Sequence, residues 1–212
     1  TAVETGGDYI KWVDFSVTDE AMTKAYKYDV KTVGGENHID WITLLALCGE
    51  KCGGNFKNFD LSYMDKCAEL LKSGKTAEEI CQNAKYFNYY KEAYDGVLGG
   101  FVGTYYIKKD GEWCENYGLK AFSPVAAGYG FSHYRDFGSS RTYGFKRKHL
   151  GNDLMGGIGT PIICVESGTV EAMGWNRYGG WRVGIRSFDR KRYYYYAHLR
   201  KDFPFNTHLK EG

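Results

Sequence analysis

His149-Leu150-Gly151-Asn152-Asp153 is the stretch from which the organisation of this 212-residue chain can be worked out. An imidazole nitrogen and a carboxylate oxygen are both good zinc ligands. In a straight strand, residues four positions apart are separated by about 13 Å, whereas two ligands of one zinc ion lie only about 3–4 Å apart. We therefore expect the chain to bend between His149 and Asp153, and Gly151-Asn152 is a pair that allows a bend.

The pair is followed by a series of short segments with strand composition. The order is Gly159-Thr160-Pro161-Ile162, Ser167-Gly168-Thr169-Val170, Gly174-Trp175 and Tyr196-Ala197-His198-Leu199. Their β-branched and aromatic residues predict strands over 161–165, 168–173, 181–187 and 193–199. Residues 186–191 join the last two strands, which we expect to pair as a hairpin.

Taken together in this order, the five segments resemble the lysostaphin/LytM-type zinc endopeptidases of bacterial cell walls, over the range Phe122 to Gly212. That family reads His-x-x-x-Asp, Gly-Thr-Pro-Val, Ser/Asp-Gly-x-Val, Gly-Trp and Tyr-x-His-Leu. The resemblance implies that His149 and Asp153 bind Zn²⁺. It also implies that His198 is catalytic, either orienting a water or stabilising charge on a tetrahedral intermediate. Upstream, Phe137-Gly138-Ser139-Ser140-Arg141 is similar to the family's Phe-Gly-x-Arg, with one extra residue.

The last predicted strand also suggests substrate-binding residues. Side chains alternate between the faces of a strand, so we expect His198 to share a face with Tyr194 and Tyr196. If His198 is catalytic, both tyrosines face the groove and could hold an extended peptide, since a tyrosine ring offers a flat apolar face and a hydroxyl. The alternative is an ordinary strand histidine, with tyrosines that fill core positions.

The family takes its third zinc ligand from a later His-x-His motif, which these 212 residues do not contain. One explanation is that the sequence is cut short, because Lys210-Glu211-Gly212 is typical of a turn toward another strand. The other explanation is a relative that has lost the motif. We do not expect His208 to act as a substitute ligand, and we expect His133 to form a hydrogen bond within a loop.

Three functions remain open at this point. The resemblance implies an extracytoplasmic hydrolase, a zinc metallopeptidase that cleaves peptide cross-links or stem peptides of peptidoglycan. The retained His149, Asp153 and His198 favour it. The absent His-x-His favours a catalytically degenerate LytM-like scaffold or activator of the cell envelope or sporulation machinery. A third possibility is a wall-binding module whose helical half carries the affinity.

Composition and charge limit the classes of partner that we expect for this chain. The formal net charge is +2 and the isoelectric point about 8.1, so we do not expect nucleic acid as the main partner, which would require a strongly basic face. No apolar run approaches the roughly 18–20 residues of a membrane span, although an anchor upstream of Thr1 is possible. The six cysteines show no Cys-x-x-Cys spacing, and we expect mostly free thiols rather than a structural zinc site.

The first half of the chain predicts helices. Apolar residues about one turn apart indicate helices near 20–32, from 37 or 40 to a stop before Gly53-Gly54, and over 63–71, 77–84 and 86–98. Thr18-Asp19 should cap the first helix, and Ser62-x-x-Asp65 and Thr76-x-x-Glu79 are capping-box patterns. Asp110-Gly111 predicts a hairpin turn. We therefore expect an α+β protein, with a helical N-terminal domain over 1–117 that includes a possible linker hairpin at 101–117. An antiparallel β LytM-like peptidase domain should follow over 118–212, incomplete at its C-terminus.

Overall fold

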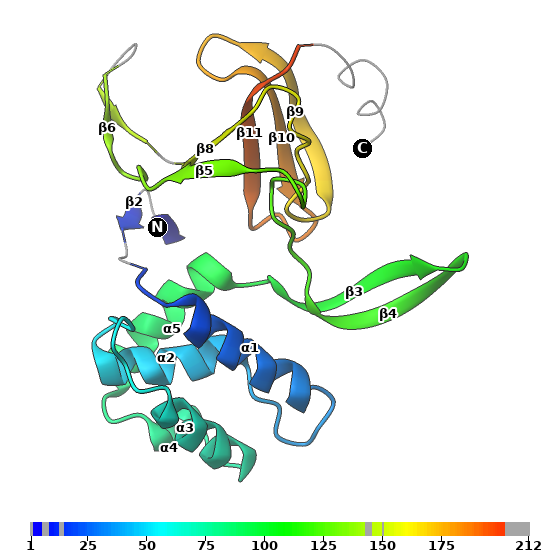
Figure 1. The fold of residues 1–212 in the computed structure, drawn as a ribbon. Coiled ribbons are helices and arrows are strands. Elements are labelled where there is room, and N and C mark those ends of the chain that lie inside the picture. Colours follow the sequence, from blue (N-terminus) through cyan, green and yellow to red (C-terminus); the bar gives the residue numbers. More distant parts are fainter. Residues whose placement is uncertain (1, 6–8, 13–14, 143–145, 150, 202–212) are drawn as a thin grey trace. The chain divides into compact units, whose positions relative to one another are not determined.

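The computed structural model describes residues 2–5, 9–12, 15–142, 146–149 and 151–201, and the chain divides into two compact units, Thr1–Lys120 and Ala121–Gly212. Within the described ranges, the helices lie in the first unit and the second unit is built from antiparallel strands (Figure 1). The predicted α+β class is confirmed.

The first unit contains helices that begin and end largely where local capping predicts. Their bounds are α1 (Asp19–Thr32), α2 (Trp41–Cys52), α3 (Ser62–Lys72), α4 (Ala77–Ile80) and α5 (Ala84–Leu98). The side chain of Thr18 accepts the Ala21 N–H at the start of α1, and Thr76 and Glu79 form a reciprocal capping box at α4. Helix α2 ends at Gly53, whose φ of 61° suits a residue without a side chain.

Two of the helix predictions need correction. Ser62 and Asp65 do not form a capping box, because Asp65 instead accepts hydrogen bonds from Lys24 Nζ and Tyr28 Oη, both at 2.7 Å. The helix predicted over 77–84 ends at Ile80. Asn83 then caps the next helix by accepting from the backbone N–H groups of Lys85 and Tyr86, so the helix predicted over 86–98 begins earlier, at Ala84.

Helix α2 lies at the centre of the core of this unit. Its buried residues are Trp41, Ile42, Leu44, Leu45, Ala46, Leu47, Cys48 and Gly49. Helix α5 approaches α2 closely at Gly49, where an added Cβ would lie 2.7 Å from Tyr94 Oη and 3.2 Å from the ring of Tyr90. A helix buried on nearly every side needs neighbours around it, and α1, α3 and α5 all pack against α2.

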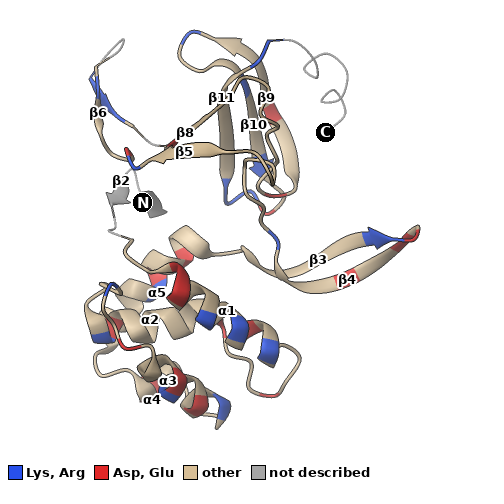
Figure 2. Cartoon of the chain, in the orientation of Figure 1, with Lys and Arg blue, Asp and Glu red and all other residues tan. Residues whose placement is uncertain are grey.

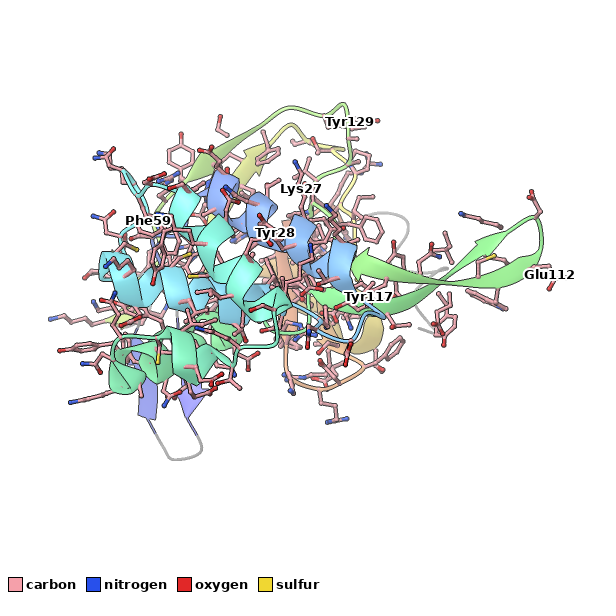
Figure 3. The ribbon with its side chains drawn as sticks, turned by 90° about the horizontal axis from the view of Figure 1, so that it is seen from below. Lys27, Tyr28, Phe59, Glu112, Tyr117 and Tyr129 are labelled. Atoms are coloured by element: carbon pink, nitrogen blue, oxygen red, sulfur yellow. The ribbon has the colours of Figure 1, made fainter. Side chains whose placement is uncertain are left out.

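The first unit also holds two antiparallel strand pairs. Strands β1 (Ala2–Thr5) and β2 (Tyr9–Trp12) form one, and β3 (Val102–Lys109) and β4 (Glu112–Leu119) form the other. The predicted turn at Asp110-Gly111 is confirmed, with φ of 50° and 92°. Figure 3 shows Glu112 at the tip of this hairpin and Tyr117 at its base.

The base of the hairpin is attached to the helices through a buried carboxylate. Asp29, on α1, is only 1% exposed. Its Oδ1 accepts from Tyr117 Oη at 2.7 Å and lies 2.9 Å from His38 Nε2, and its Oδ2 accepts from Trp41 N at 2.9 Å. A buried charge is tolerated only when it is fully hydrogen-bonded. Asp29 therefore joins α1, the start of α2 and β4.

The second unit is organised around a three-stranded antiparallel sheet. Its strands are β9 (Gly168–Asn176), β10 (Gly180–Ser187) and β11 (Tyr193–Leu199), with β10 in the middle. Val183 and Ile185 on β10 are buried, and partly buried side chains from all three strands pack on them. The predicted pairing of the last two strands across 186–191 is confirmed.

The strand predicted over 161–165 does not form. This segment lies beside residues 122–126, where Val125 and Ile162 form an isolated bridge. Backbone hydrogen bonds join the two segments at Phe122 N to Val165 O, Ala126 N to Pro161 O and Ile163 N to Pro124 O, but they do not form a regular ladder. Pro124 and Pro161 face this pairing, and their missing N–H groups remove donors that a regular ladder requires.

Four shorter strands form two further pairs that were not predicted. Strand β5 (Phe131–Tyr134) pairs with β8 (Asp153–Gly156), and β6 (Ser140–Arg141) pairs with β7 (Arg147–Lys148). His133 therefore lies in a strand rather than in the expected loop. All four residues of β5 are exposed, so this strand has no apolar–polar alternation by which it could have been recognised.

Charged residues of both signs are mixed on the helices of the first unit, for example on α1 and α3 (Figure 2).

The six cysteines are free thiols. None of the helices in the described ranges has the length and apolar character needed to span a membrane.

We expect Tyr117→Phe to lower the free energy of unfolding of the helical unit by about 1–3 kcal/mol, because the ionised, buried Asp29 loses one donor. Urea unfolding followed by far-UV circular dichroism measures the effect. Tyr106→Phe is the matched control on the same hairpin, since Tyr106 Oη bonds the exposed Glu115. An equal loss in both variants would contradict a special role for Asp29.

Candidate metal centre

The two short strand pairs of the second unit bring four side chains to one bend. Tyr134 is paired with Asp153 in β5–β8, and Arg141 with Arg147 in β6–β7. Between these pairs both segments leave the strand conformation. On one side the chain turns at Gly138, with a φ of 78°; on the other, β7 ends at Lys148 and β8 begins at Asp153. Asp136, Arg141, His149 and Asp153 therefore surround a shared bend.

Backbone hydrogen bonds keep the two segments together through the bend. Gly138 N donates to His149 O at 2.7 Å, and His149 N donates to Ser139 O at 2.9 Å. The bend brings His149 Nε2 to 3.6 Å from Asp153 Oδ1. This separation lies in the range of about 3–4 Å expected for two ligands of one zinc ion.

Asp136 belongs to the same group, although the sequence did not single it out. Ligand atoms of Asp136, His149 and Asp153 all lie within 4.8 Å of one another, so the three residues form a group that could hold a metal ion. Asp136 Oδ2 lies 2.9 Å from His149 Nδ1, and Asp136 Oδ1 accepts from Asp153 N at 3.2 Å. The only sequence signal was its position directly before Phe137-Gly138.

Asp136 is held in its ionised form. Partial burial acts to raise the pKa of its carboxyl group, but hydrogen bonds from Asp153 and the neighbouring His149 outweigh burial and lower that pKa below its usual value. An ionised carboxylate can only accept hydrogen bonds.

Arg141 places a positive charge beside both carboxylates. Its Nη2 forms an ion pair with Asp136 Oδ2 and a second, at 2.8 Å, with Asp153 Oδ2, and it lies 3.0 Å from His149 Nδ1. The side chain of His149 is 19% exposed and that of Asp153 is 42% exposed. Solvent can therefore reach this group, as a centre that exchanges water or substrate requires.

The two tyrosines predicted to bind substrate contact the interior of the sheet. Tyr194 Oη donates to Glu166 Oε2 at 2.8 Å, and Glu166 is 7% exposed and also bound by Arg192. Tyr196 Oη accepts from Val165 N at 2.8 Å, and burial raises the pKa of Tyr196 to about 12. Both hydroxyl groups serve structural hydrogen bonds, and the role of the two tyrosines in substrate binding stays a prediction.

His198 does not share a face with these tyrosines, which corrects the parity argument. Val183 is paired with Tyr196 and Trp181 with Leu199, so Ala197 and His198 together face one residue of β10. This β-bulge interrupts the alternation. His198 is exposed with a φ of 56°, while Leu199 returns to the core.

The catalytic role of His198 also stays a prediction. Its N–H donates to Gly179 O at 2.7 Å. Among the described residues, the side chains hydrogen-bonded to His149 and Asp153 are those of Asp136 and Arg141. His208 lies outside the described ranges.

Comparison with known proteins relates part of the chain to a peptidase. The L-Ala--D-Glu endopeptidase of Bacillus subtilis (strain 168) is 42% identical over 69 residues, which is 32% of this chain and 21% of that protein. The chain thus spans about a fifth of the length of this curated relative. No family model and no solved structure matches the chain.

We expect Tyr194→Phe to lower the free energy of unfolding of the full chain by about 1.5–3 kcal/mol, because the buried Glu166 carboxylate loses a donor. Hydrogen bonds from Arg192 and Tyr194 outweigh the effect of burial and hold the pKa of Glu166 below its ordinary 4.5. A lowered folded-state pKa stabilises above the ordinary value, and this contribution is lost as the pH falls through the folded-state pKa. The difference between variant and wild type should therefore shrink below pH 4.5.

Urea unfolding at neutral pH and at pH 3–4 measures both effects. Tyr193→Phe is the matched control, since Tyr193 is 40% exposed and its ring stacks with Arg186 at 4.7 Å. A Tyr194→Phe protein as stable as the control at neutral pH would contradict a structural role for this hydroxyl group.

Proposed function

We propose that this chain forms part of a zinc-dependent endopeptidase of the lysostaphin/LytM type, which hydrolyses peptide cross-links or stem peptides of bacterial peptidoglycan. The observation that carries the proposal is the 3.6 Å separation of His149 Nε2 and Asp153 Oδ1, at the head of the ordered series of family-like segments. The name of the Bacillus relative, an L-Ala--D-Glu endopeptidase, supports the reaction. It also makes a stem peptide with an L-Ala–D-Glu bond the first substrate to test.

The residues present fit a zinc ion in donor type, spacing and access. An imidazole nitrogen and a carboxylate oxygen are ordinary zinc ligands, and the two atoms lie at a suitable separation on a partly exposed bend. When bound, zinc would lower the pKa of a coordinated water towards about 7 and polarise a scissile carbonyl.

Each candidate site residue would have a separate role. His149 and Asp153 would hold the ion. His198, exposed at the end of β11, would supply a general acid–base or charge-stabilising group to the substrate. The hydroxyl groups of Tyr194 and Tyr196 are engaged by Glu166 and Val165 and their rings pack on Val183 and Ile185, so contact with a peptide would use the parts of these side chains that stay exposed. A peptidoglycan substrate implies an extracytoplasmic location.

A second candidate function is a catalytically inactive LytM-like scaffold or activator of the envelope or sporulation machinery. One observation favours it. Arg141 forms ion pairs with both Asp136 and Asp153, so these carboxylates have a cationic partner that does not depend on a metal. Zinc content separates this candidate from the peptidase.

We expect the 212-residue chain to bind zinc weakly or not at all and to hydrolyse wall peptides poorly, because it supplies the two proposed ligands His149 and Asp153, whereas catalytic zinc sites have three protein ligands. A form extended through a His-x-His strand should bind zinc tightly and be active. In that form, Asp153→Ala should abolish metal binding. His198→Ala should keep the metal and reduce the rate by roughly 10²–10⁴-fold.

Zinc content by elemental analysis and peptide release from purified peptidoglycan are the measurements. His133→Ala is the matched control, because His133 is an exposed histidine on β5, and this variant should keep both metal and activity. Full activity in His198→Ala would remove His198 from the mechanism. An extended wild type that holds no zinc and cuts nothing would favour the scaffold.

A further inference from the structure

The hydrogen count at Arg141 determines where the proton of His149 lies. Nη2 of Arg141 carries two hydrogens and faces three atoms that could accept them: Asp136 Oδ2, Asp153 Oδ2 and His149 Nδ1. One of these three atoms therefore receives no hydrogen bond from Arg141 Nη2. A hydrogen bond to a carboxylate adds the attraction between opposite charges, which an uncharged imidazole nitrogen lacks. The two carboxylates therefore take both hydrogens, and an uncharged His149 ring does not accept from Arg141.

The remaining contact then fixes the tautomer of the ring. Asp136 Oδ2 lies 2.9 Å from His149 Nδ1. An ionised carboxylate can only accept, so Nδ1 must carry the hydrogen and donate it. In a neutral imidazole the other nitrogen then has a free lone pair. That nitrogen is Nε2, which lies 3.6 Å from Asp153 Oδ1.

The two carboxylate oxygens of Asp153 also have separate partners. Oδ2 accepts from Arg141 at 2.8 Å, which leaves Oδ1 directed toward His149 Nε2. We propose that Asp136 and Arg141 are positioning residues that reserve Nε2 of His149 and Oδ1 of Asp153 for a metal ion. Asp136 fixes the Nδ1–H tautomer, and Arg141 fixes the carboxylate. This inference rests on the proposed function for the ion, although the tautomer itself can be measured without any metal.

The same contacts argue against Asp136 as a third ligand. Its Oδ2 is engaged by His149 Nδ1 and Arg141, and its Oδ1 accepts from Asp153 N at 3.2 Å. A carboxylate that bonds the distal nitrogen of a metal-binding histidine is the usual outer partner of such a ligand. Asp136 therefore acts through His149.

The direct test is nitrogen NMR of ¹⁵N-histidine-labelled, metal-free protein at a pH at which the ring is neutral. The chain has five histidines, and His149 is assigned from its missing signals in His149→Gln. We expect Nδ1 of His149 to be the protonated nitrogen and Nε2 the unprotonated one. The opposite tautomer in the wild type would overturn the proposal without any variant.

Variants give a prediction that a merely structural role would not produce. Asp136→Ala frees one Arg141 hydrogen, which His149 Nδ1 can accept at the existing 3.0 Å, so the ring should switch to the Nε2–H tautomer. Arg141→Met should keep the wild-type tautomer. In the Asp136→Ala/Arg141→Met double variant no Arg141 hydrogen is available to His149 Nδ1, so the ring should not switch to the Nε2–H tautomer. An unchanged tautomer in Asp136→Ala, with the fold intact by its amide spectrum, would refute the assignment.

Metal affinity is the second readout, measured in the form extended through a His-x-His strand by competition of Zn²⁺ with a chelator. Loss of an outer partner costs typically about 10–100-fold in affinity, and we expect losses of this size in Asp136→Ala and in Arg141→Met. Arg135→Met is the matched control, because Arg135 is exposed on the same segment, and its affinity should equal that of the wild type. Equal affinities in all proteins would contradict positioning. An extended form that binds no Zn²⁺ contradicts the proposed function, while the tautomer of the metal-free protein still decides the role of Asp136.

Discussion

The ion-pair cluster around Arg141 is the interaction on which the candidate site depends. A single guanidinium nitrogen contacts Asp136, Asp153 and His149, and these residues come from both sides of a bend shared by two chain segments. Strand β5 is fully exposed and β8 nearly so, so little apolar burial supports this region. The cluster and the few backbone bonds across the bend hold it together, because opposite charges close to one another compensate for the missing core.

The helical unit is stabilised in the opposite way. There the apolar helix α2 is surrounded by its neighbours, and the buried carboxylate of Asp29 has three hydrogen-bond partners, His38, Trp41 and Tyr117. Burial of apolar side chains supplies most of the free energy that stabilises this unit. Hydrogen bonding to Asp29 fixes how the base of the β3–β4 hairpin joins the helices. The described part of the chain thus combines a unit built on apolar packing with a unit whose functional region is built on polar contacts.

In the central sheet of the second unit, a candidate functional motif and residues of the core occupy the same strand, β11. Tyr194 and Tyr196 belong to the motif-like end of β11, yet their hydroxyl groups bond Glu166 and Val165 and their rings pack on Val183 and Ile185. The bulge at Ala197-His198 then turns His198 out to solvent. One extra residue in a strand is enough to separate the face that packs from the side chain that could react.

The sequence by itself determined the helical first half, most helix ends, the Asp110-Gly111 hairpin and the pairing of β10 with β11. These features follow from local capping, turn chemistry and periodicity, which act within a few residues. The sequence also drew attention to His149 and Asp153 and predicted a bend between them, on the hypothesis that both bind one zinc ion.

The other features of the second unit depend on contacts between segments that are distant in the sequence. Asp136 and Arg141 join the site through contacts across 13 and 8 residues of sequence. The similarity of 137–141 to a family pattern drew attention to Arg141, but it did not predict these contacts. The pairing of β5 with β8 has no alternation to reveal it, and the bulge at His198 depends on register against β10. Pairings between distant segments are set by which partners meet in space, and that information lies in the fold rather than in any short stretch of the chain.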